Sequence, residues 1–257
     1  MKKRIINIIT ASLVLLFAGC EKSTDYNAVF SEPGANDARL KVIYASAYAL
    51  NPLVQLSIDD VRVSGLITGR TPFPGGGYNT AGSNFPDYLV VAPGSRKFTV
   101  SIPKKGTNVD SVVLFSTQIA VEAGKSQTLN VMDTLSKTKT LVVTDVIEQP
   151  IGGTVKYRFV NLMPNAPLLD LYYGTTRVAT GIAYNTPGIV FSMSVPAVTN
   201  LSWAIRETGT SATSTALAVY ASANTVTNQR MFTAFAMGYK SSTSATLKPY
   251  ISFTINY

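Results

Sequence analysis

The residues best suited to ligand binding lie in one glycine-rich stretch, residues 73–86 (FPGGGYNTAGSNFP). Three aromatic side chains, those of Phe73, Tyr78 and Phe85, stand there among glycine, serine and asparagine residues. Aromatic rings can stack on sugars, and an amide such as that of Asn79 can hydrogen-bond to sugar hydroxyls, while loops on a rigid scaffold commonly carry binding sites. We therefore predict Phe73, Tyr78, Asn79 and Phe85 as candidate ligand-binding residues. The alternative is a long connection whose aromatic side chains pack back onto a sheet.

Residue types that enzymes commonly use are scarce in this chain. It has no histidine, which excludes Ser-His-Asp triads and histidine-ligated zinc. Beyond residue 153 the only carboxylate side chains are those of Asp170 and Glu207, whereas a glycosidase needs two placed about 5–10 Å apart. The pair Asp59 and Asp60 could form half of a calcium site, but adjacent carboxylates in a hairpin turn are more often solvated. We predict a protein that is not an enzyme, with no catalytic residues, no cofactor and no metal site.

The first twenty residues have the pattern of an export signal. A positive segment, Lys2 to Arg4, precedes an apolar segment of 15 residues, Ile5 to Gly19. Fifteen helical residues span about 22 Å, less than the ~30 Å core of a bilayer, so a secretory signal fits better than a membrane span. The small residues before Cys20 resemble the lipobox of bacterial lipoproteins, although Phe17 stands where leucine is usual. An ordinary signal peptide followed by a chance cysteine is the alternative.

The lipobox interpretation predicts how the protein is located. Residues 1–19 would be a lipoprotein signal peptide, and acyl chains on Cys20 would attach the protein to a membrane. The polar residues 20–38 would form a flexible tether. We therefore expect an exported, lipid-anchored protein at the outer membrane or cell surface.

Charge and composition exclude one class of partner and favour one class of fold. The formal net charge is +8, but the basic residues are scattered instead of gathered on one segment, so we predict no nucleic-acid partner. Only 14% of residues are charged, and Thr, Val and Tyr are plentiful. Such a composition favours strands over amphipathic helices.

The chain repeats part of its own sequence. Residues 51–56 (NPLVQL) correspond to residues 166–171 (APLLDL) at an offset of 115, and later matches occur at smaller offsets in the same order. We interpret this as a duplication with two domains, residues 39–147 and 154–257, and with an insertion in the first domain that lies within residues 73–86. About seven short alternating segments in each domain are typical of two tandem immunoglobulin-like β-sandwich domains, an all-β fold.

One segment resembles a known family. Residues 156–172 (KYRFVNLMPNAPLLDLY) are similar to the opening of a bacterial domain of unknown function that is common, often in tandem, in cell-envelope lipoproteins of Bacteroidetes. The resemblance implies a β-sandwich and an envelope location, but no established activity. The first domain departs from the pattern, since it has Gln55 in place of Asp170. We expect the Asp170 carboxylate to accept backbone N–H groups instead of binding a ligand.

These observations predict a non-catalytic cell-envelope lipoprotein that binds a glycan or a protein through sandwich loops. The alternative is a fimbria-like structural or adhesin subunit. In such subunits, processing after an arginine ahead of the first strand frees a groove for a strand from the next subunit. Arg39 stands just before the apolar segment Leu40 to Tyr44 and has the position required.

Overall fold

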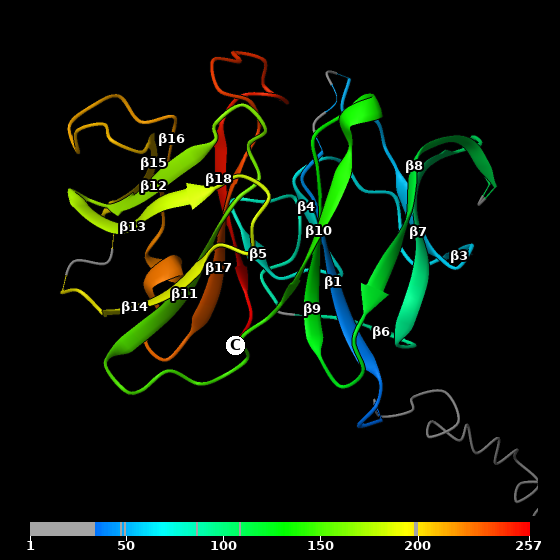
Figure 1. Ribbon diagram of the computed structural model, residues 1–257, viewed down its shortest axis with the longest axis horizontal. Coiled ribbons are helices and arrows are strands. Elements are labelled where there is room, and N and C mark those ends of the chain that lie inside the picture. Colours follow the sequence, from blue (N-terminus) through cyan, green and yellow to red (C-terminus); the bar gives the residue numbers. More distant parts are fainter. Residues whose placement is uncertain (1–33, 47, 49, 86, 108, 198–199) are drawn as a thin grey trace, which may run out of the picture. The chain divides into compact units, whose positions relative to one another are not determined.

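The computed structural model describes residues 34–257, except residues 47, 49, 86, 108 and 198–199 (Figure 1). The predicted signal peptide, the predicted lipidation site Cys20 and most of the predicted tether lie outside the described residues. Residues 34–257 form one compact unit. Its only described helices are the short 3-10 helices η1 (Leu135–Lys137) and η2 (Ala223–Val226). Within the described residues, no helix has the length and apolar character needed to cross a membrane.

The first half of the chain forms two sheets that pack face to face. Its strands are β1 (Ala38–Tyr44), β2 (Gln55–Ile58), β3 (Val61–Arg62), β4 (Thr71–Phe73), β6 (Leu89–Val91), β7 (Gly94–Pro103), β8 (Asp110–Val121), β9 (Ser126–Met132) and β10 (Lys139–Thr144). Sheet 1 has the order β10-β9-β1-β4, with β6 also paired to β1, and sheet 2 has the order β3-β2-β7-β8. Alternate residues of β1, such as Leu40 and Val42, pack against Leu56 and Phe98 of sheet 2 in a shared core.

The second half forms another two sheets. Its strands are β11 (Thr154–Asn161), β12 (Leu168–Tyr173), β13 (Thr176–Ala183), β14 (Ile189–Ser194), β15 (Ser202–Glu207), β16 (Ala218–Ala221), β17 (Met231–Met237) and β18 (Tyr250–Ile255). Sheet 3 has the order β14-β11-β17-β18, and strand β5 (Gly77–Tyr78) of the first half is added next to β18. Sheet 4 has the order β13-β12-β15-β16. Trp203 lies in the core between sheets 3 and 4, where its indole N–H donates to the Thr225 hydroxyl at 2.8 Å.

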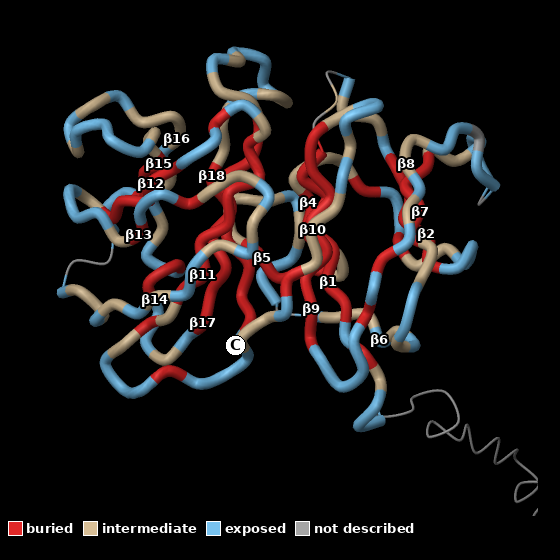
Figure 2. The backbone as a smooth tube through the Cα atoms, viewed as in Figure 1, coloured by how far each residue is buried: buried red, intermediate tan, exposed pale blue. Residues whose placement is uncertain are grey.

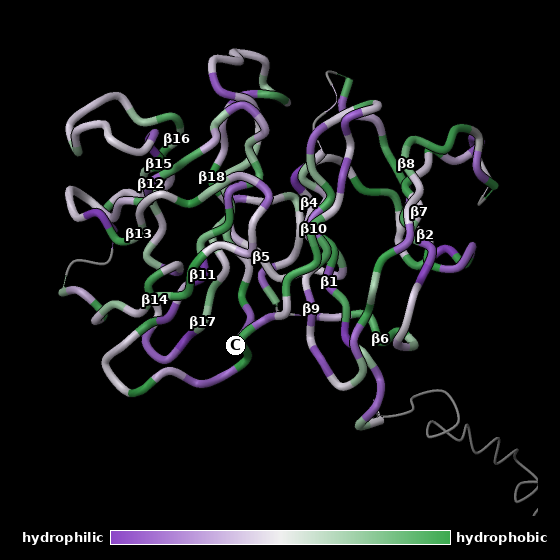
Figure 3. The backbone as a smooth tube through the Cα atoms, viewed as in Figure 1, coloured by the Kyte–Doolittle hydropathy of each residue, from purple (hydrophilic) through white to green (hydrophobic). Residues whose placement is uncertain are grey.

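The prediction of an all-β fold built from sandwiches is confirmed, and the two halves share one pairing scheme. In each half the first strand pairs in parallel with a strand near the end of that half, as β1 does with β9 and β11 with β17. The second strand lies between its hairpin partner and the next long strand, as β12 lies between β13 and β15. Figure 2 shows buried stretches along the strands of both halves, and Figure 3 shows that hydropathy changes from residue to residue along several of these strands.

The outer faces of sheets 1 and 3 pack against each other. Ile43 and Met132 of sheet 1 form one buried apolar cluster with Val160, Phe235 and Met237 of sheet 3. The two sandwiches are therefore joined by a face of each sheet that an isolated sandwich would expose to water. We call this contact the intersheet interface.

Strand β18 shows the effect of this packing on polar residues. The sequence alternates, so that Ile251, Phe253 and Ile255 enter the core of their own sandwich. Ser252 and Thr254 occupy the other face, yet they are also buried. Ser252 is paired directly with Phe235, so its side chain lies on the face that forms the intersheet interface.

A group of charged side chains lies beside the apolar part of the interface. Lys41 of β1 is buried, and its ammonium donates to the Ile255 carbonyl of β18 at 3.1 Å. The same ammonium lies 4.8 Å from the centre of the Tyr88 ring, and the Tyr88 hydroxyl donates to the Asp145 carboxylate at 3.0 Å. Burial lowers the pKa of Lys41 to about 8, although Asp145 and Asp87 oppose this shift. Burial also raises the pKa of Asp145, against hydrogen bonds from Thr128 and Tyr88 and the charge of Lys41.

Candidate functional site

The glycine-rich insertion interrupts an edge strand of the first sandwich. In the second sandwich, β14 pairs with β11 without a break from Thr154 to Phe159. In the first sandwich, β4 pairs with one end of β1 and β6 with the other end, and residues 74–85 leave the sheet between them. Part of this segment forms β5, which pairs antiparallel with β18 at the edge of sheet 3. The insertion therefore connects the first sandwich to the second.

Several side chains fix the insertion on the second sandwich. The Asn79 amide donates to the Ile251 carbonyl at 2.6 Å, and the Tyr250 hydroxyl donates to the Asn79 side-chain oxygen at 2.7 Å. Gly77 has to be glycine because a Cβ atom there would lie 2.8 Å from the Phe253 carbonyl oxygen. Nearby, the Arg70 guanidinium donates to the carbonyls of Thr246 and Lys248 at 3.1 and 2.7 Å.

A pocket of about 290 Å³ lies where the insertion meets the second sandwich. Tyr78, Asn84 and Phe85 line it from the insertion, and Thr227 and Arg230 line it from the turn before β17, with Phe232 and Ile255 completing the wall. We call it the insertion pocket.

The insertion pocket combines groups of different chemistry. Its aromatic part is anchored by Tyr78, whose ring centre is 6.2 Å from that of the buried Phe232. Phe85 is 78% exposed and presents its ring to solvent. Arg230 is also exposed, and among the described residues its guanidinium has no hydrogen-bond or ion-pair partner. The pocket thus offers the packed ring of Tyr78, the exposed ring of Phe85, the amide of Asn84, the hydroxyl of Thr227 and the exposed guanidinium of Arg230.

The structure brings together two of the four predicted ligand-binding residues. Tyr78 and Phe85 both line the insertion pocket. Phe73 instead pairs with Val42 in sheet 1 and packs against the core of the first sandwich. Asn79 uses its amide to hold the insertion in place. Sequence reasoning did not single out Thr227 and Arg230, since they lie more than 140 residues along the chain from the insertion and carry no local motif.

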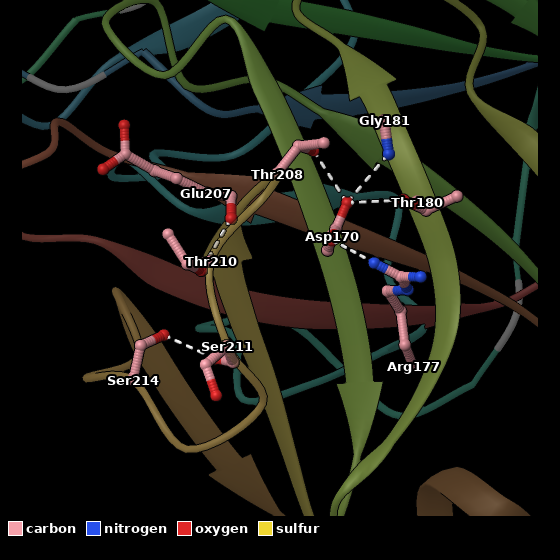
Figure 4. Close-up of polar contacts among 9 residues, drawn as sticks. All are labelled: Asp170, Arg177, Thr180, Gly181, Glu207, Thr208, Thr210, Ser211 and Ser214. Carbon is pink, nitrogen blue, oxygen red and sulfur yellow. Dashed lines mark hydrogen bonds and ion pairs between the residues drawn. The ribbon is translucent and has the colours of Figure 1, made fainter.

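Asp170, at the centre of the motif that carries the family resemblance, is fully buried in β12 (Figure 4). One of its carboxylate oxygens accepts hydrogen bonds from the Thr208 hydroxyl at 2.7 Å, the Thr180 hydroxyl at 2.9 Å and the Gly181 N–H at 2.9 Å. The other oxygen lies 3.4 Å from the Arg177 guanidinium. The expected hydrogen bond from a backbone N–H is confirmed. The carboxylate joins β12 to the irregular part of β13 and to the end of β15.

These contacts determine the charge state of Asp170. Burial alone would raise the pKa of this carboxyl group. The hydrogen bonds from Thr208, Gly181 and Thr180, with the charge of Arg177, outweigh burial and hold the pKa of Asp170 below its usual value. The group is therefore an ionised, fully engaged acceptor at neutral pH.

Other carboxylates proposed for chemistry are engaged in ion pairs. Glu207 pairs with Lys240 at 2.7 Å, and its side chain points away from Asp170 in Figure 4. Asp59 pairs with Arg96 at 3.1 Å and accepts the Lys97 N–H, while Asp60 pairs with Lys97 at 2.7 Å. Among the described residues, no group of three or more Asp, Glu, His or Cys side chains converges as a metal ligand set would.

The first sandwich has no carboxylate at the position that corresponds to Asp170. Gln55 occupies the position that corresponds to Asp170, and its amide donates to the Asp110 carboxylate at 2.5 Å. The Ser101 hydroxyl also donates to that carboxylate. The negative group of the first sandwich thus comes from β8 instead of β2.

Replacing Asp170 with asparagine tests its role in stability. We expect Asp170→Asn to lower the free energy of unfolding by about 2–3 kcal/mol at pH 7, because an amide cannot accept all the hydrogen bonds that the carboxylate accepts. The folded-state pKa of Asp170 is lowered, so its contribution is present above the unfolded-state value of about 3.9 and is lost as the pH falls through the folded-state pKa. Urea unfolding from pH 7 to pH 2.5 measures both effects.

The matched control for this variant is Asp60→Asn, which removes an exposed carboxylate. We expect that variant to lose less than about 1 kcal/mol. The assignment is wrong if Asp170→Asn has the same stability as the parent at pH 7, or if the difference between the two proteins does not shrink in acid.

Comparison with known sequences gives a family but no function. No curated protein matches this chain. The family described as a domain of unknown function (DUF4397) matches residues 38–172, more than half of the chain. The match begins at the first residue of β1 and ends one residue before the end of β12, so it includes the first sandwich and the strand that carries Asp170. The chain therefore belongs to the DUF4397 family.

Proposed function

We propose that this chain is a non-catalytic binding protein of the cell envelope and that it holds a glycan in the insertion pocket. The observation that carries the proposal is the convergence of Tyr78, Asn84, Phe85 and Arg230 around one pocket. Three of these residues, Tyr78, Asn84 and Phe85, come from the stretch whose composition predicts sugar binding.

The chemistry of the pocket favours a sugar that bears a carboxylate. The exposed Phe85 ring offers an apolar face on which a sugar ring can stack, and Asn84 and Thr227 supply groups that hydrogen-bond to hydroxyls. A guanidinium binds a carboxylate through two parallel hydrogen bonds, and Arg230 has no competing partner among the described residues. The ligand that fits these groups best is an acidic glycan.

The arrangement of carboxylates supports a role in binding over catalysis. Both carboxylate side chains of the second half are committed, since Asp170 is buried under four contacts and Glu207 is paired with Lys240. A retaining or inverting glycosidase requires two carboxyl groups that face each other across the substrate. Asp170 and Glu207 are not placed in that way.

Location and domain organisation extend the proposal. The apolar segment and Cys20 at the start of the chain support a lipid anchor that holds the folded unit at an outer membrane or cell surface. The shared pairing scheme of the two halves supports two copies of the family domain in tandem. The resemblance of residues 156–172 to envelope lipoproteins of Bacteroidetes agrees with both points.

The alternative of a fimbria-like subunit processed near Arg39 receives less support. Arg39 is the second residue of β1 and is paired with both β6 and β9. A cut after Arg39 would remove only Ala38 and Arg39 from β1 and would leave Leu40 to Tyr44 in sheet 1. Among the described residues of β1, such a cut would free only the positions of Ala38 and Arg39 beside β6 and β9.

The glycan proposal is tested with the chain from residue 21 to residue 257, which contains every described strand. We expect this protein to bind acidic glycans on a glycan array. Phe85→Ala and Arg230→Gln should each weaken the affinity for the best ligand at least about fivefold, measured by calorimetry, because they remove the stacking face and the carboxylate partner. Leu135→Ala, which also truncates an exposed side chain but lies outside the pocket, should bind as the parent does.

Two results would contradict the glycan proposal. One is the absence of any glycan ligand on the array. The other is a ligand whose affinity is unchanged in both Phe85→Ala and Arg230→Gln, because such a ligand would bind elsewhere.

The anchor is tested by mass spectrometry of the protein made in a bacterium that processes lipoproteins. We expect the mature chain to begin at Cys20 and to carry acyl chains. Cys20→Ser should stay unacylated and should be lost from the membrane fraction. An unmodified thiol at Cys20 in the mature protein would refute the anchor without affecting the glycan proposal.

A further inference from the structure

An apolar cavity of about 610 Å³ lies at the end of the unit where β1 finishes. Tyr48 and Leu50, which follow β1, line it with Ile102 of β7 and Leu114 of β8, and Leu135 of η1 closes another side. Leu247, between β17 and β18, completes the wall. The cavity is therefore built from both halves of the chain and lies at the opposite end of β1 from Ala38, where the chain enters the first sandwich.

The walls of this cavity offer few hydrogen-bonding groups. The hydroxyl of Tyr239, another lining residue, already donates to the Asp133 carboxylate at 2.7 Å. Leu50 is 93% exposed and Leu135 is 69% exposed, so the rim presents large apolar side chains to water. A volume of this size is in the range of small-molecule sites, and its lining fits an apolar group.

A second pocket, of about 340 Å³, adjoins the apolar cavity and shares Ile102 with it. Lys104 and Lys105, at the tip of the β7–β8 hairpin, line this second pocket together with Leu53. Both lysines are exposed, and neither ammonium has an ion-pair partner among the described residues. A pocket that carries two lysines thus lies near an apolar cavity, and the two have Ile102 as a common lining residue.

We propose that the two pockets together bind an anionic amphiphile with a single alkyl chain, of the fatty-acid class. The alkyl chain occupies the apolar cavity, and the carboxylate lies at Lys104 and Lys105. The charge of the lysines complements a carboxylate, and the cavity accepts a chain that has no hydrogen-bonding groups of its own. The exposed Leu50 and Leu135 could also contact a bilayer, but a bilayer surface would not require a cavity of this volume. This inference uses none of the residues of the insertion pocket and is independent of the glycan proposal.

The test uses residues 21–257 and three probes below their micellar concentrations, namely dodecanoate, decanoate and dodecyltrimethylammonium. By calorimetry we expect dodecanoate to bind at one site per chain. Decanoate, with two methylene groups fewer, should bind about fifteenfold more weakly. Dodecyltrimethylammonium has the same alkyl chain with the opposite charge and should bind more weakly than dodecanoate.

Two pairs of variants locate the site. Leu50→Asp places a charge at the cavity rim and should weaken dodecanoate binding at least about tenfold. Its control is Val61→Asp, at an exposed position of β3 outside the cavity, which should bind as the parent does. Lys104→Glu with Lys105→Glu should weaken dodecanoate binding at least about fivefold, whereas Lys125→Glu, in the exposed turn before β9, should not.

The inference is overturned if dodecanoate does not bind. It is also overturned if dodecyltrimethylammonium binds as tightly as dodecanoate, or if Leu50→Asp and the double lysine variant both bind as the parent does. Binding to vesicles of anionic phospholipid without binding of free dodecanoate would assign this surface to a bilayer and would equally refute the proposal.

Discussion

The structure depends on the burial of the outer face of sheet 1 against the outer face of sheet 3. Ile43 and Met132 meet Phe235 and Met237 there, and each such side chain removed from water contributes about 1.5–3 kcal/mol. Without this contact each sandwich would still have its own core, but the insertion pocket and the apolar cavity would each lose part of their walls. Tyr78 and Arg230 come from different halves, as do Leu50 and Leu247. The intersheet interface therefore determines both candidate sites.

The interface also contains polar groups, and these specify how the faces meet. Lys41 bonds to the Ile255 carbonyl, and Arg158 of β11 donates to the Thr144 carbonyl at 3.1 Å, so each sandwich donates to the other. Burial lowers the pKa of Lys41 to about 8 and raises the pKa of Asp145, because removal from water disfavours the charged form of each group. The charge of each group opposes the shift that burial causes in the other, and Tyr88 lies between them.

Sequence reasoning predicts the local parts of this architecture well. Alternation in segments such as 251–256 predicts strands, and the scarcity of charged residues favours an all-β fold. Sequence reasoning fails for residues whose burial or contacts depend on the other sandwich. The polar residues Ser252 and Thr254 are typical of a solvent-facing side, but the first sandwich covers them. The composition of the insertion indicates Tyr78 and Phe85 correctly as neighbours in one pocket, yet nothing near the insertion points to Arg230, because only the pairing of β5 with β18 brings the two segments together. Asp170 was predictable as an acceptor of backbone N–H groups, whereas its hydroxyl partners required the register of three strands.

We infer that the two sandwiches act as one unit through the intersheet interface. Scanning calorimetry of residues 21–257 tests this claim most directly, since a single cooperative unit has equal calorimetric and van't Hoff enthalpies of unfolding. We predict one transition with equal enthalpies. Two resolved transitions, or a calorimetric enthalpy about twice the van't Hoff value, would show that the sandwiches unfold independently and would contradict this inference.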